Sequence, residues 1–148
     1  MTVEAFKSNV QLQPGRLLCE ATVRGFKVQM DEPETMGGTD QAMNPVELLL
    51  CALGGCLCIC AGAFSKAARV DLTAFEVDLE GDLDPDGFMG KNKNVRTGFQ
   101  GIRAVMKITS KSPQENLEKM IQMIKTVCPV SDTLKGVNVK ADYEIKHG

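Results

Sequence analysis

The stretch from Asn44 to Phe64 constrains the fold of this chain more than any other segment. After Asn44-Pro45-Val46-Glu47 it reads LLLCALGGCLCICAGAF, a run of apolar and small residues without a charge. A helix that is apolar on every side must be buried on every side. We therefore expect one long core helix here, with the rest of the chain supplying the material that buries it.

The start of this helix is well marked. Asn44 is a good N-cap residue, Pro45 suits the first helical position, and Glu47 stands where a capping-box carboxylate reaches back to the N-cap. We expect the helix to continue through Phe64 as far as Ala68. Its apolar part lies at the short end of the ~17–25 residues that span a membrane, and no Trp or Tyr flanks it. We favour a buried core helix over a membrane helix.

The remaining chain predicts an α+β fold with antiparallel strands, because consecutive strands meet at short turns. Alternating apolar and polar residues indicate strands, and capping residues followed by an apolar stripe at helical spacing indicate a second helix. The expected elements are strands over 2–12, 17–23 and 26–30, a loop over 31–43, the core helix, a strand over 75–83, a turn over 84–87, a loop over 88–99, a strand over 102–108, a helix from Ser112, a short helical turn after Cys128-Pro129, and a last strand over 137–145.

The burial of the core helix predicts a homodimer. The 148 residues suit a single domain over 1–148, but a sheet with one apolar face covers only one side of the helix. A second copy of the chain can cover the other side. The Gly54-Gly55 pair costs roughly 2 kcal/mol of helix propensity relative to alanine, and we expect it to permit the close approach of another backbone.

Charge and composition exclude several function classes. The net charge of −2 and the pI of about 5.5 give no basic surface for nucleic acid or for an anionic membrane. The amino terminus lacks the basic and apolar regions of a secretory signal, so we expect a cytoplasmic protein. In that compartment the six cysteines indicate buried thiols or redox chemistry rather than structural disulfides.

Thiol chemistry is what the chain has available. The only histidine is His147, next to the last residue, so a Ser-His or Cys-His mechanism lacks its base. Cys56 and Cys60 share one helix face while Cys58 points nearly away, so these thiols cannot surround a metal, and no nucleotide-binding loop is present. Cys56 follows the glycine pair, which leaves room for a reactant. Cys128 opens a helical turn, where we expect backbone N–H groups to lower its thiol pKa.

Two motifs together resemble the OsmC/Ohr family of osmotically inducible and organic hydroperoxide resistance proteins. The first runs from Asn44-Pro45-Val46-Glu47-Leu48 to Cys56, and the second is Cys128-Pro129-Val130-Ser131 with Leu134. The resemblance implies antiparallel sheets wrapped around central helices in an intertwined homodimer. It also implies peroxidase activity on organic hydroperoxides without a cofactor, with a dithiol such as a lipoyl group as reductant. By this resemblance Cys56 is the peroxidatic cysteine and Cys128 the resolving cysteine.

One departure from the family pattern concerns the activation of the thiol. The hydroperoxide reductases carry a carboxylate directly after Asn-Pro, paired with an activating arginine, and here that position is Val46. The neighbouring Glu47 could orient such an arginine, although its capping role explains it without catalysis. Arg24 stands nearest to where the resemblance places the arginine, and an exposed turn arginine is the competing interpretation. Arg96 and Arg103 are the further candidates.

Two alternatives to the peroxidase stay open at this level. The chain could be a non-enzymatic dimer whose apolar cleft binds a small lipophilic molecule, with the cysteines as packing residues. It could also be a thiol redox sensor that releases a partner protein on oxidation. A reactive Cys56 that forms a disulfide with Cys128 on peroxide treatment would argue against the first of these.

Overall fold

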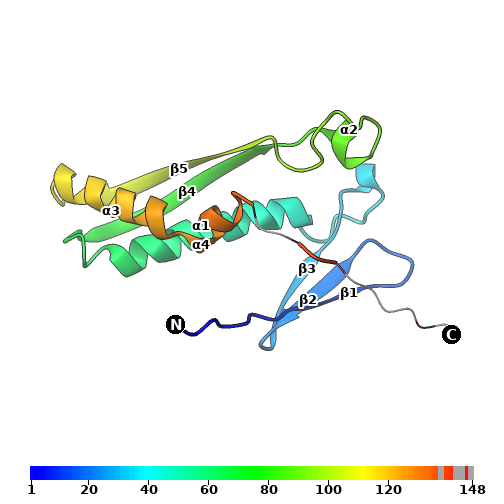
Figure 1. Cartoon of the computed structure of the whole chain (residues 1–148), viewed down its shortest axis with the longest axis horizontal. Coiled ribbons are helices and arrows are strands. Elements are labelled where there is room, and N and C mark those ends of the chain that lie inside the picture. Colours follow the sequence, from blue (N-terminus) through cyan, green and yellow to red (C-terminus); the bar gives the residue numbers. More distant parts are fainter. Residues whose placement is uncertain (137–138, 142–145, 147–148) are drawn as a thin grey trace. The chain divides into compact units, whose positions relative to one another are not determined.

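The computed structural model describes residues 1–136, 139–141 and 146 (Figure 1). The chain forms two compact units, Met1–Cys51 and Ala52–Gly148. Both sheets are antiparallel and helices alternate with them along the chain, which confirms the predicted α+β class. The predicted strand over 137–145 and His147 fall largely outside the described residues. The single domain over 1–148 stays a prediction.

The first unit is built on a three-stranded antiparallel sheet in the order β1-β2-β3. The strands are β1 (Asn9–Leu12), β2 (Cys19–Val23) and β3 (Phe26–Met30). The predicted first strand over 2–12 is shorter than expected, because β2 offers ladder partners only from Thr22, opposite Asn9, to Cys19, opposite Leu12. Arg24 and Gly25 both have positive φ, 51° and 87°, as a two-residue hairpin turn between twisted strands requires.

The loop that follows β3 is organised by a buried carboxylate. Asp31 accepts hydrogen bonds from the Thr39 hydroxyl at 2.6 Å and from the backbone N–H of Gln41 at 3.1 Å and of Glu32 at 2.8 Å. These bonds, led by that of Thr39, lower the pKa of Asp31 to about 2. The loop contains a 3-10 helix, η1 (Glu34–Met36), and it brings the chain to the start of the long helix.

The long helix, α1, spans Pro45–Phe64 and starts as the sequence predicts. The Asn44 side-chain oxygen accepts from the Glu47 N–H at 2.9 Å, and a Glu47 carboxylate oxygen accepts from the Asn44 N–H at 2.8 Å. This reciprocal pair is a capping box. Among the described residues, α1 is the one helix long and apolar enough to cross a membrane, a property that it shares with core helices of soluble proteins.

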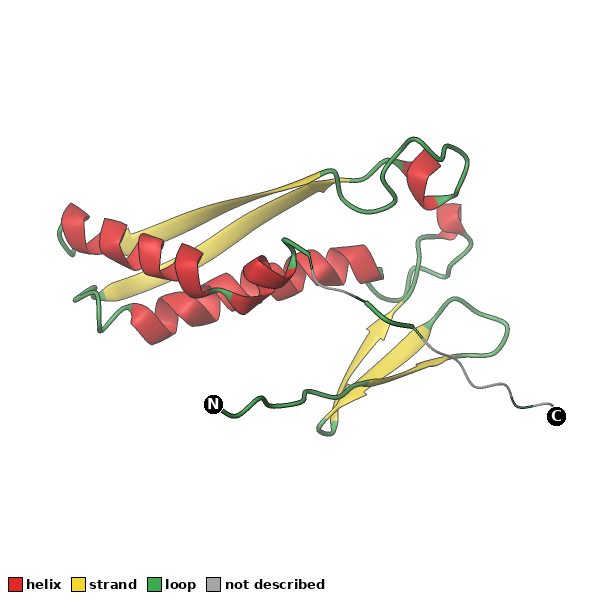
Figure 2. Ribbon diagram, in the orientation of Figure 1, coloured by secondary structure: helices red, strands yellow, loops and turns green. Residues whose placement is uncertain are grey.

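The second unit combines a long hairpin with most of α1 and with further helices. Strands β4 (Leu72–Asp82) and β5 (Gly101–Ser110) pair antiparallel, with Val77 opposite Met106. Between them lies the short helix α2 (Pro85–Phe88), capped by the Asp84 side chain, where the sequence predicted a turn. Helices α3 (Gln114–Val127) and α4 (Pro129–Thr133) follow β5. Figure 2 shows α1, α3 and α4 beside the hairpin.

The core of the second unit lies between one face of the hairpin and these helices. Met120 and Ile124 of α3 are fully buried, and they pack with Leu57 of α1 and, from the sheet, with Leu79 and Met106. The opposite face of the hairpin is charged: Arg103 pairs with Glu80 and Asp82, and Lys107 pairs with Glu76 and Asp78. The alternation predicted for both strands therefore separates a core face from a solvent face.

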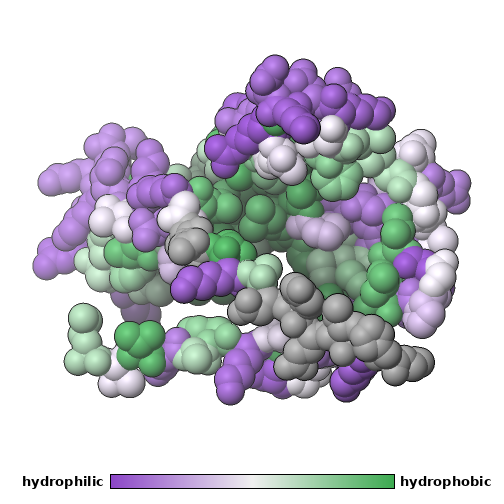
Figure 3. Space-filling model, turned by 45° about the vertical axis from the view of Figure 1, so that its right-hand side comes forward, coloured by the Kyte–Doolittle hydropathy of each residue, from purple (hydrophilic) through white to green (hydrophobic). Residues whose placement is uncertain are grey.

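One chain buries only part of α1. The buried stripe consists of Leu53, Gly54, Leu57, Cys60 and Ala61. Ile59, on the opposite face, keeps 75% of its surface exposed, and Figure 3 shows apolar surface left uncovered on the molecule. A Cβ on Gly54 would lie 2.7 Å from the Leu79 Cδ1, so this glycine serves the chain's own sheet, whereas a Cβ on Gly55 or Gly62 would meet nothing within 4 Å.

Candidate thiol site

The structure brings Cys56 and Cys128 into contact. Cys56 lies in the middle of α1, and Cys128 lies in the junction between α3 and α4. The Cys128 thiol donates to the Cys56 sulfur across 2.9 Å, although the two residues are 72 positions apart in the sequence. Both cysteines are free thiols. A disulfide bond of ~2.05 Å would require the two sulfurs to approach by only about 0.9 Å.

The local sequence fixes the position of Cys128. Its backbone N–H donates to the Ile124 carbonyl at 3.2 Å, which ends α3, and Pro129 then occupies the first position of α4. Proline has no backbone N–H group to donate, so it fits the first turn of a helix but not the interior of one. The Cys128 sulfur caps the short helix by accepting from the Ser131 N–H at 3.5 Å. The junction therefore holds the thiol against α1.

The predicted lowering of the Cys128 pKa is wrong. Burial raises the pKa of this thiol, and its hydrogen bond to Cys56 raises it further, while the backbone N–H groups of Ser131 and Val130 act in the opposite direction. Cys128 is 1% exposed, and removing a thiolate from water outweighs the contribution of one short helix turn. Cys56 is half-buried, so it is the more accessible thiol of the pair.

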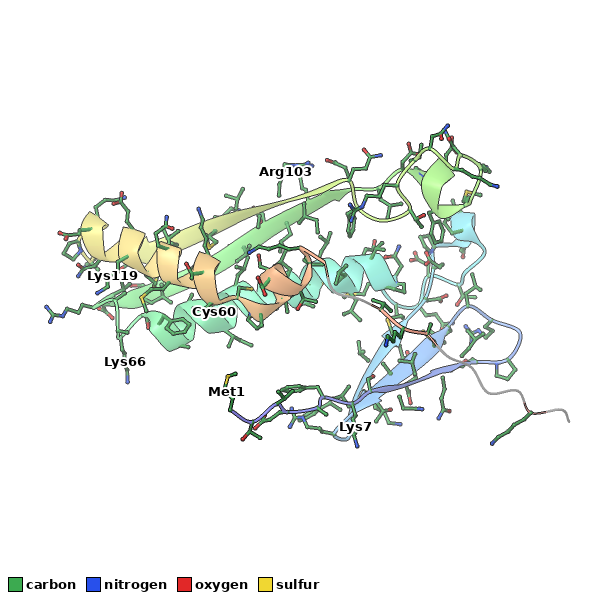
Figure 4. The ribbon with its side chains drawn as sticks, in the orientation of Figure 1. Met1, Lys7, Cys60, Lys66, Arg103 and Lys119 are labelled. Carbon is green, nitrogen blue, oxygen red and sulfur yellow. The ribbon has the colours of Figure 1, made fainter. Side chains whose placement is uncertain are left out.

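Cys60 is a third thiol at this site, and sequence reasoning did not select it. It follows Cys56 by one helical turn and is 7% exposed. Figure 4 labels Cys60 among the side chains. Burial is the largest cause that raises the pKa of Cys60, and the charge of Cys128 raises it further. The shared face of Cys56 and Cys60 was the available signal. Cys58 is exposed, as its position on the helix predicts.

The expectation that the thiols do not surround a metal stays a prediction. Over residues 1–136, 139–141 and 146, no group of three or more His, Cys, Asp or Glu side chains is placed to hold a metal ion.

Glu47 has a structural explanation. Its carboxylate is occupied with the Asn44 N–H in the capping box, and it lies nine residues before Cys56 on α1, roughly 14 Å along a straight helix. Val46 lies in the first turn of the same helix and is 36% exposed. No ion pair joins Glu47 to an arginine within the part of the chain that the structure describes. Its catalytic role stays a prediction.

The candidate arginines are placed as follows. Arg24 lies in the β2–β3 turn of the first unit, with its guanidinium 5.3 Å from the centre of the Phe26 ring. Arg103 lies on the charged face of the hairpin, bound to Glu80 and Asp82, and these carboxylates raise its pKa. Arg103 therefore faces away from the core that contains the thiols. Arg96 lies in an exposed loop.

Neither thiol of the pair receives a hydrogen bond from an arginine among the described residues. The features that the structure brings together are therefore the three thiols Cys56, Cys60 and Cys128 and the helix junction that holds Cys128. Arg24 and Glu47 lie in the first unit, and their relation to Cys56 stays a prediction.

Comparison with known proteins agrees with this fold. Residues 38–142 match the family described as OsmC-like protein. A crystal structure of an OsmC-like protein from Mycoplasma pneumoniae covers 92% of this chain and 91% of its own, with a TM-score of 0.78 and 18% identity. An organic hydroperoxide resistance protein OsmC from Legionella pneumophila covers 90% of this chain and 93% of its own, with a TM-score of 0.65 and 20% identity.

A curated relative is also similar in sequence. An uncharacterised protein of Methanocaldococcus jannaschii is 26% identical over 112 residues, which make up 76% of this chain. The match covers 54% of that relative, so this chain spans about half of its length. The family match extends over more than half of the chain and includes Asn44, Glu47, Cys56 and Cys128. The chain belongs to the OsmC-like protein family.

Proposed function

We propose that the chain is a thiol peroxidase that reduces organic hydroperoxides. The observation that carries the proposal is the contact of 2.9 Å between the half-buried Cys56 and the buried Cys128. A peroxidatic sulfur must be reached by its substrate, whereas a resolving thiol only has to reach the oxidised sulfur. The name of the Legionella pneumophila relative, an organic hydroperoxide resistance protein, supports the choice of substrate class.

The first step takes place at Cys56. Its thiolate attacks the distal oxygen of the hydroperoxide, so that an S–O bond forms while the O–O bond breaks. Cys56 becomes a sulfenic acid, and the alkoxide takes up a proton and leaves as an alcohol. Cys128 retains its own proton during this step because burial raises its pKa, and its S–H group is in place to donate to the Cys56 sulfur.

The second step closes a disulfide. The Cys128 sulfur attacks the sulfur of the Cys56 sulfenic acid, and the hydroxyl leaves as water with the Cys128 proton. A dithiol then reopens the disulfide in two exchange steps and is itself oxidised to a cyclic disulfide. No cofactor takes part in this cycle. Lipoyl-type dithiols are the reductants that we expect, with Arg24 and Glu47 as the candidate groups that orient and activate Cys56.

Peroxide consumption with a dithiol reductant tests the proposal. Wild type should consume cumene hydroperoxide in the presence of dihydrolipoamide, and Cys56→Ser should fall to the rate of dihydrolipoamide alone. Cys128→Ser should accumulate a Cys56 sulfenic acid that dimedone traps. Cys58→Ser, an exposed thiol on the same helix, is the matched control and should behave as wild type. Equal rates in wild type and Cys56→Ser would refute the proposal.

Two other outcomes correspond to the remaining interpretations. A Cys56–Cys128 disulfide that forms but is not turned over by dithiols would indicate a redox sensor. Thiols that do not react with hydroperoxide, together with binding of a small lipophilic molecule, would indicate a ligand-binding scaffold. We place the activity in the cytoplasm, where a reducing environment keeps the cysteines as thiols.

We further propose that a second copy of the chain covers the exposed face of α1. Gly55 and Gly62 lie on this face, where a Cβ added to either would meet nothing within 4 Å, and Ile59 is 75% exposed there. Small residues at this spacing permit close helix packing, and a large exposed apolar side chain gives a reason for it. Sedimentation should show a dimer that Ile59→Lys weakens, and a monomeric wild type would contradict this proposal.

A further inference from the structure

Cys60 is a nucleophile that the proposed cycle does not use. It lies one helical turn beyond Cys56 on the same face of α1, and it belongs to the same buried cluster as Cys128. Of the three cysteines at 56, 58 and 60, only Cys58 is exposed. The junction of α3 and α4 therefore places Cys128 in contact with Cys56 and in the buried cluster that also contains Cys60.

We propose that disulfide exchange converts the Cys56–Cys128 disulfide into a Cys60–Cys128 disulfide. The exchange frees the Cys56 thiol to reduce a second hydroperoxide. This inference rests on the proposed peroxidase function and assigns a role to a residue outside it. The exchange passes the oxidising equivalent from the half-buried sulfur of Cys56 to the buried sulfur of Cys60. The structure thereby supports storage of one disulfide in the core while the accessible thiol is regenerated.

The exchange step is balanced within the protein. The Cys60 thiolate attacks the Cys128 sulfur of the Cys56–Cys128 disulfide, so that a Cys60–Cys128 bond forms as the Cys56–Cys128 bond breaks. The electron pair of the broken bond leaves on Cys56, and the net proton transfer is from Cys60 to Cys56. No oxidant or reductant is consumed. The next hydroperoxide then oxidises Cys56 to a sulfenic acid and leaves as an alcohol.

Helix geometry decides between the two disulfides that Cys60 could form. The Cα atoms of residues four apart in a helix are about 6.2 Å apart, near the upper limit of ~6.8 Å for a disulfide. A Cys56–Cys60 bond would also have to run along the helix surface within rigid backbone. Cys128 comes from a different element, so its spacing from Cys60 is not set by the repeat of a single helix, and the Cys60–Cys128 bond is the one that we expect.

The three cysteines share one part of the core. Cys60 and Cys128 belong to the same buried cluster and Cys56 packs against it, and the charge of Cys128, after burial, raises the pKa of Cys60. Burial raises the pKa of Cys60 and of Cys128. The thiolate that starts the exchange is therefore scarce at neutral pH, and the second turnover should be slower than the first.

The test counts hydroperoxide consumed per chain without any reductant. The parent protein is Cys58→Ser, in which chymotryptic cleavage after Leu57 leaves Cys60 as the only cysteine of fragment 58–64 and separates it from Cys56. The parent should consume about two molecules of cumene hydroperoxide per chain. Cys58→Ser with Cys60→Ala should consume about one. Mass spectrometry should find a bond between fragment 58–64 and the peptide that contains Cys128 in the parent alone.

The outcomes separate the relay from the peroxidase. Consumption of about one molecule by both proteins, with only the Cys56–Cys128 bond present, would overturn the relay and leave the peroxidase intact. Consumption no greater than in Cys56→Ser would overturn both. Cys60→Ser serves as a second variant if Cys60→Ala does not fold, since either substitution removes the exchanging sulfur.

Discussion

Oxidation of Cys56 and Cys128 to a disulfide should stabilise the fold considerably. The two cysteines are 72 positions apart in the sequence, and a cross-link of that span removes loop-closure entropy from the unfolded chain worth about 4 kcal/mol at 25 °C. The sulfurs already lie 2.9 Å apart, so closing the bond should introduce little strain into the native state. Nearly the whole of that stabilisation should therefore be observed.

Urea denaturation of oxidised and reduced protein measures this difference. One equivalent of cumene hydroperoxide gives the oxidised form and a phosphine gives the reduced form, and far-UV circular dichroism follows unfolding. The extrapolated free energies of unfolding should differ by about 4 kcal/mol, which corresponds to a rise of roughly 10 °C in the melting temperature of a chain of this size. Cys128→Ser, which cannot form the bond, should show no difference between the two treatments.

The result also bears on the reductant. A disulfide that stabilises the folded chain is itself stabilised by the fold to the same extent, which corresponds to about 90 mV in reduction potential. A monothiol would reduce such a bond poorly, whereas a dithiol that closes into a ring removes it efficiently. Oxidised protein as stable as reduced protein, or less stable, would refute this reasoning and would show that the α3–α4 junction must distort to form the bond.

Three further predictions concern packing, acid stability and reactivity. Gly54→Ala should destabilise the fold by about 1 kcal/mol in urea denaturation, because its Cβ would lie 2.7 Å from the Leu79 Cδ1 and this overpacking outweighs the gain in helix propensity. The matched control is Gly55→Ala. It should raise the free energy of unfolding by about 1 kcal/mol in an isolated chain, and it should lower it if a second chain packs closely against Gly55. Because the folded pKa of Asp31, about 2, is below its ordinary value of 3.8, its stabilisation is present above pH 3.8 and is lost as the pH falls toward 2. Asp31→Asn should remove that part of the acid dependence of the melting temperature, whereas Asp71→Asn, which changes an exposed carboxylate, should not. Iodoacetamide should alkylate Cys56 before Cys128, and alkylation of Cys128 should require a higher pH because burial raises its pKa; mass spectrometry that found Cys128 modified first would contradict the assignment of roles.

Patterns that depend on local interactions were predictable from the sequence. The capping box at Asn44 and Glu47 placed the first residue of α1 correctly, because its partners are three residues apart. Alternation located β4 and β5, although both strands extend beyond the alternating residues, since backbone pairing continues from Leu72 opposite Ser110 to Asp82 opposite Gly101. The same local logic would have found α2, where Asp84 caps a helix with Pro85 in its first turn.

Features that depend on how distant segments pack were not predictable in this way. The sequence shows that Cys56 and Cys60 share a face, but only the position of the α3–α4 junction along α1 brings Cys128 into contact with Cys56. Gly54 and Gly55 look equivalent in the sequence, yet one lies against Leu79 and the other is open. In each case the deciding contact comes from a residue far away in the chain.

The Cys128 thiol shows how tertiary burial can reverse a local rule and still produce useful chemistry. A helix start favours a thiolate, but Cys128 lies in the core, and burial raises its pKa. The proton therefore stays on the buried sulfur, and the S–H group donates to the more accessible sulfur of Cys56. In the proposed peroxidase, this difference in burial is the physical reason for expecting attack at Cys56 and resolution at Cys128, without an arginine among the described groups that contact either thiol. The proposed order of the two steps thus rests on the accessibility of the two sulfurs as well as on their sequence motifs.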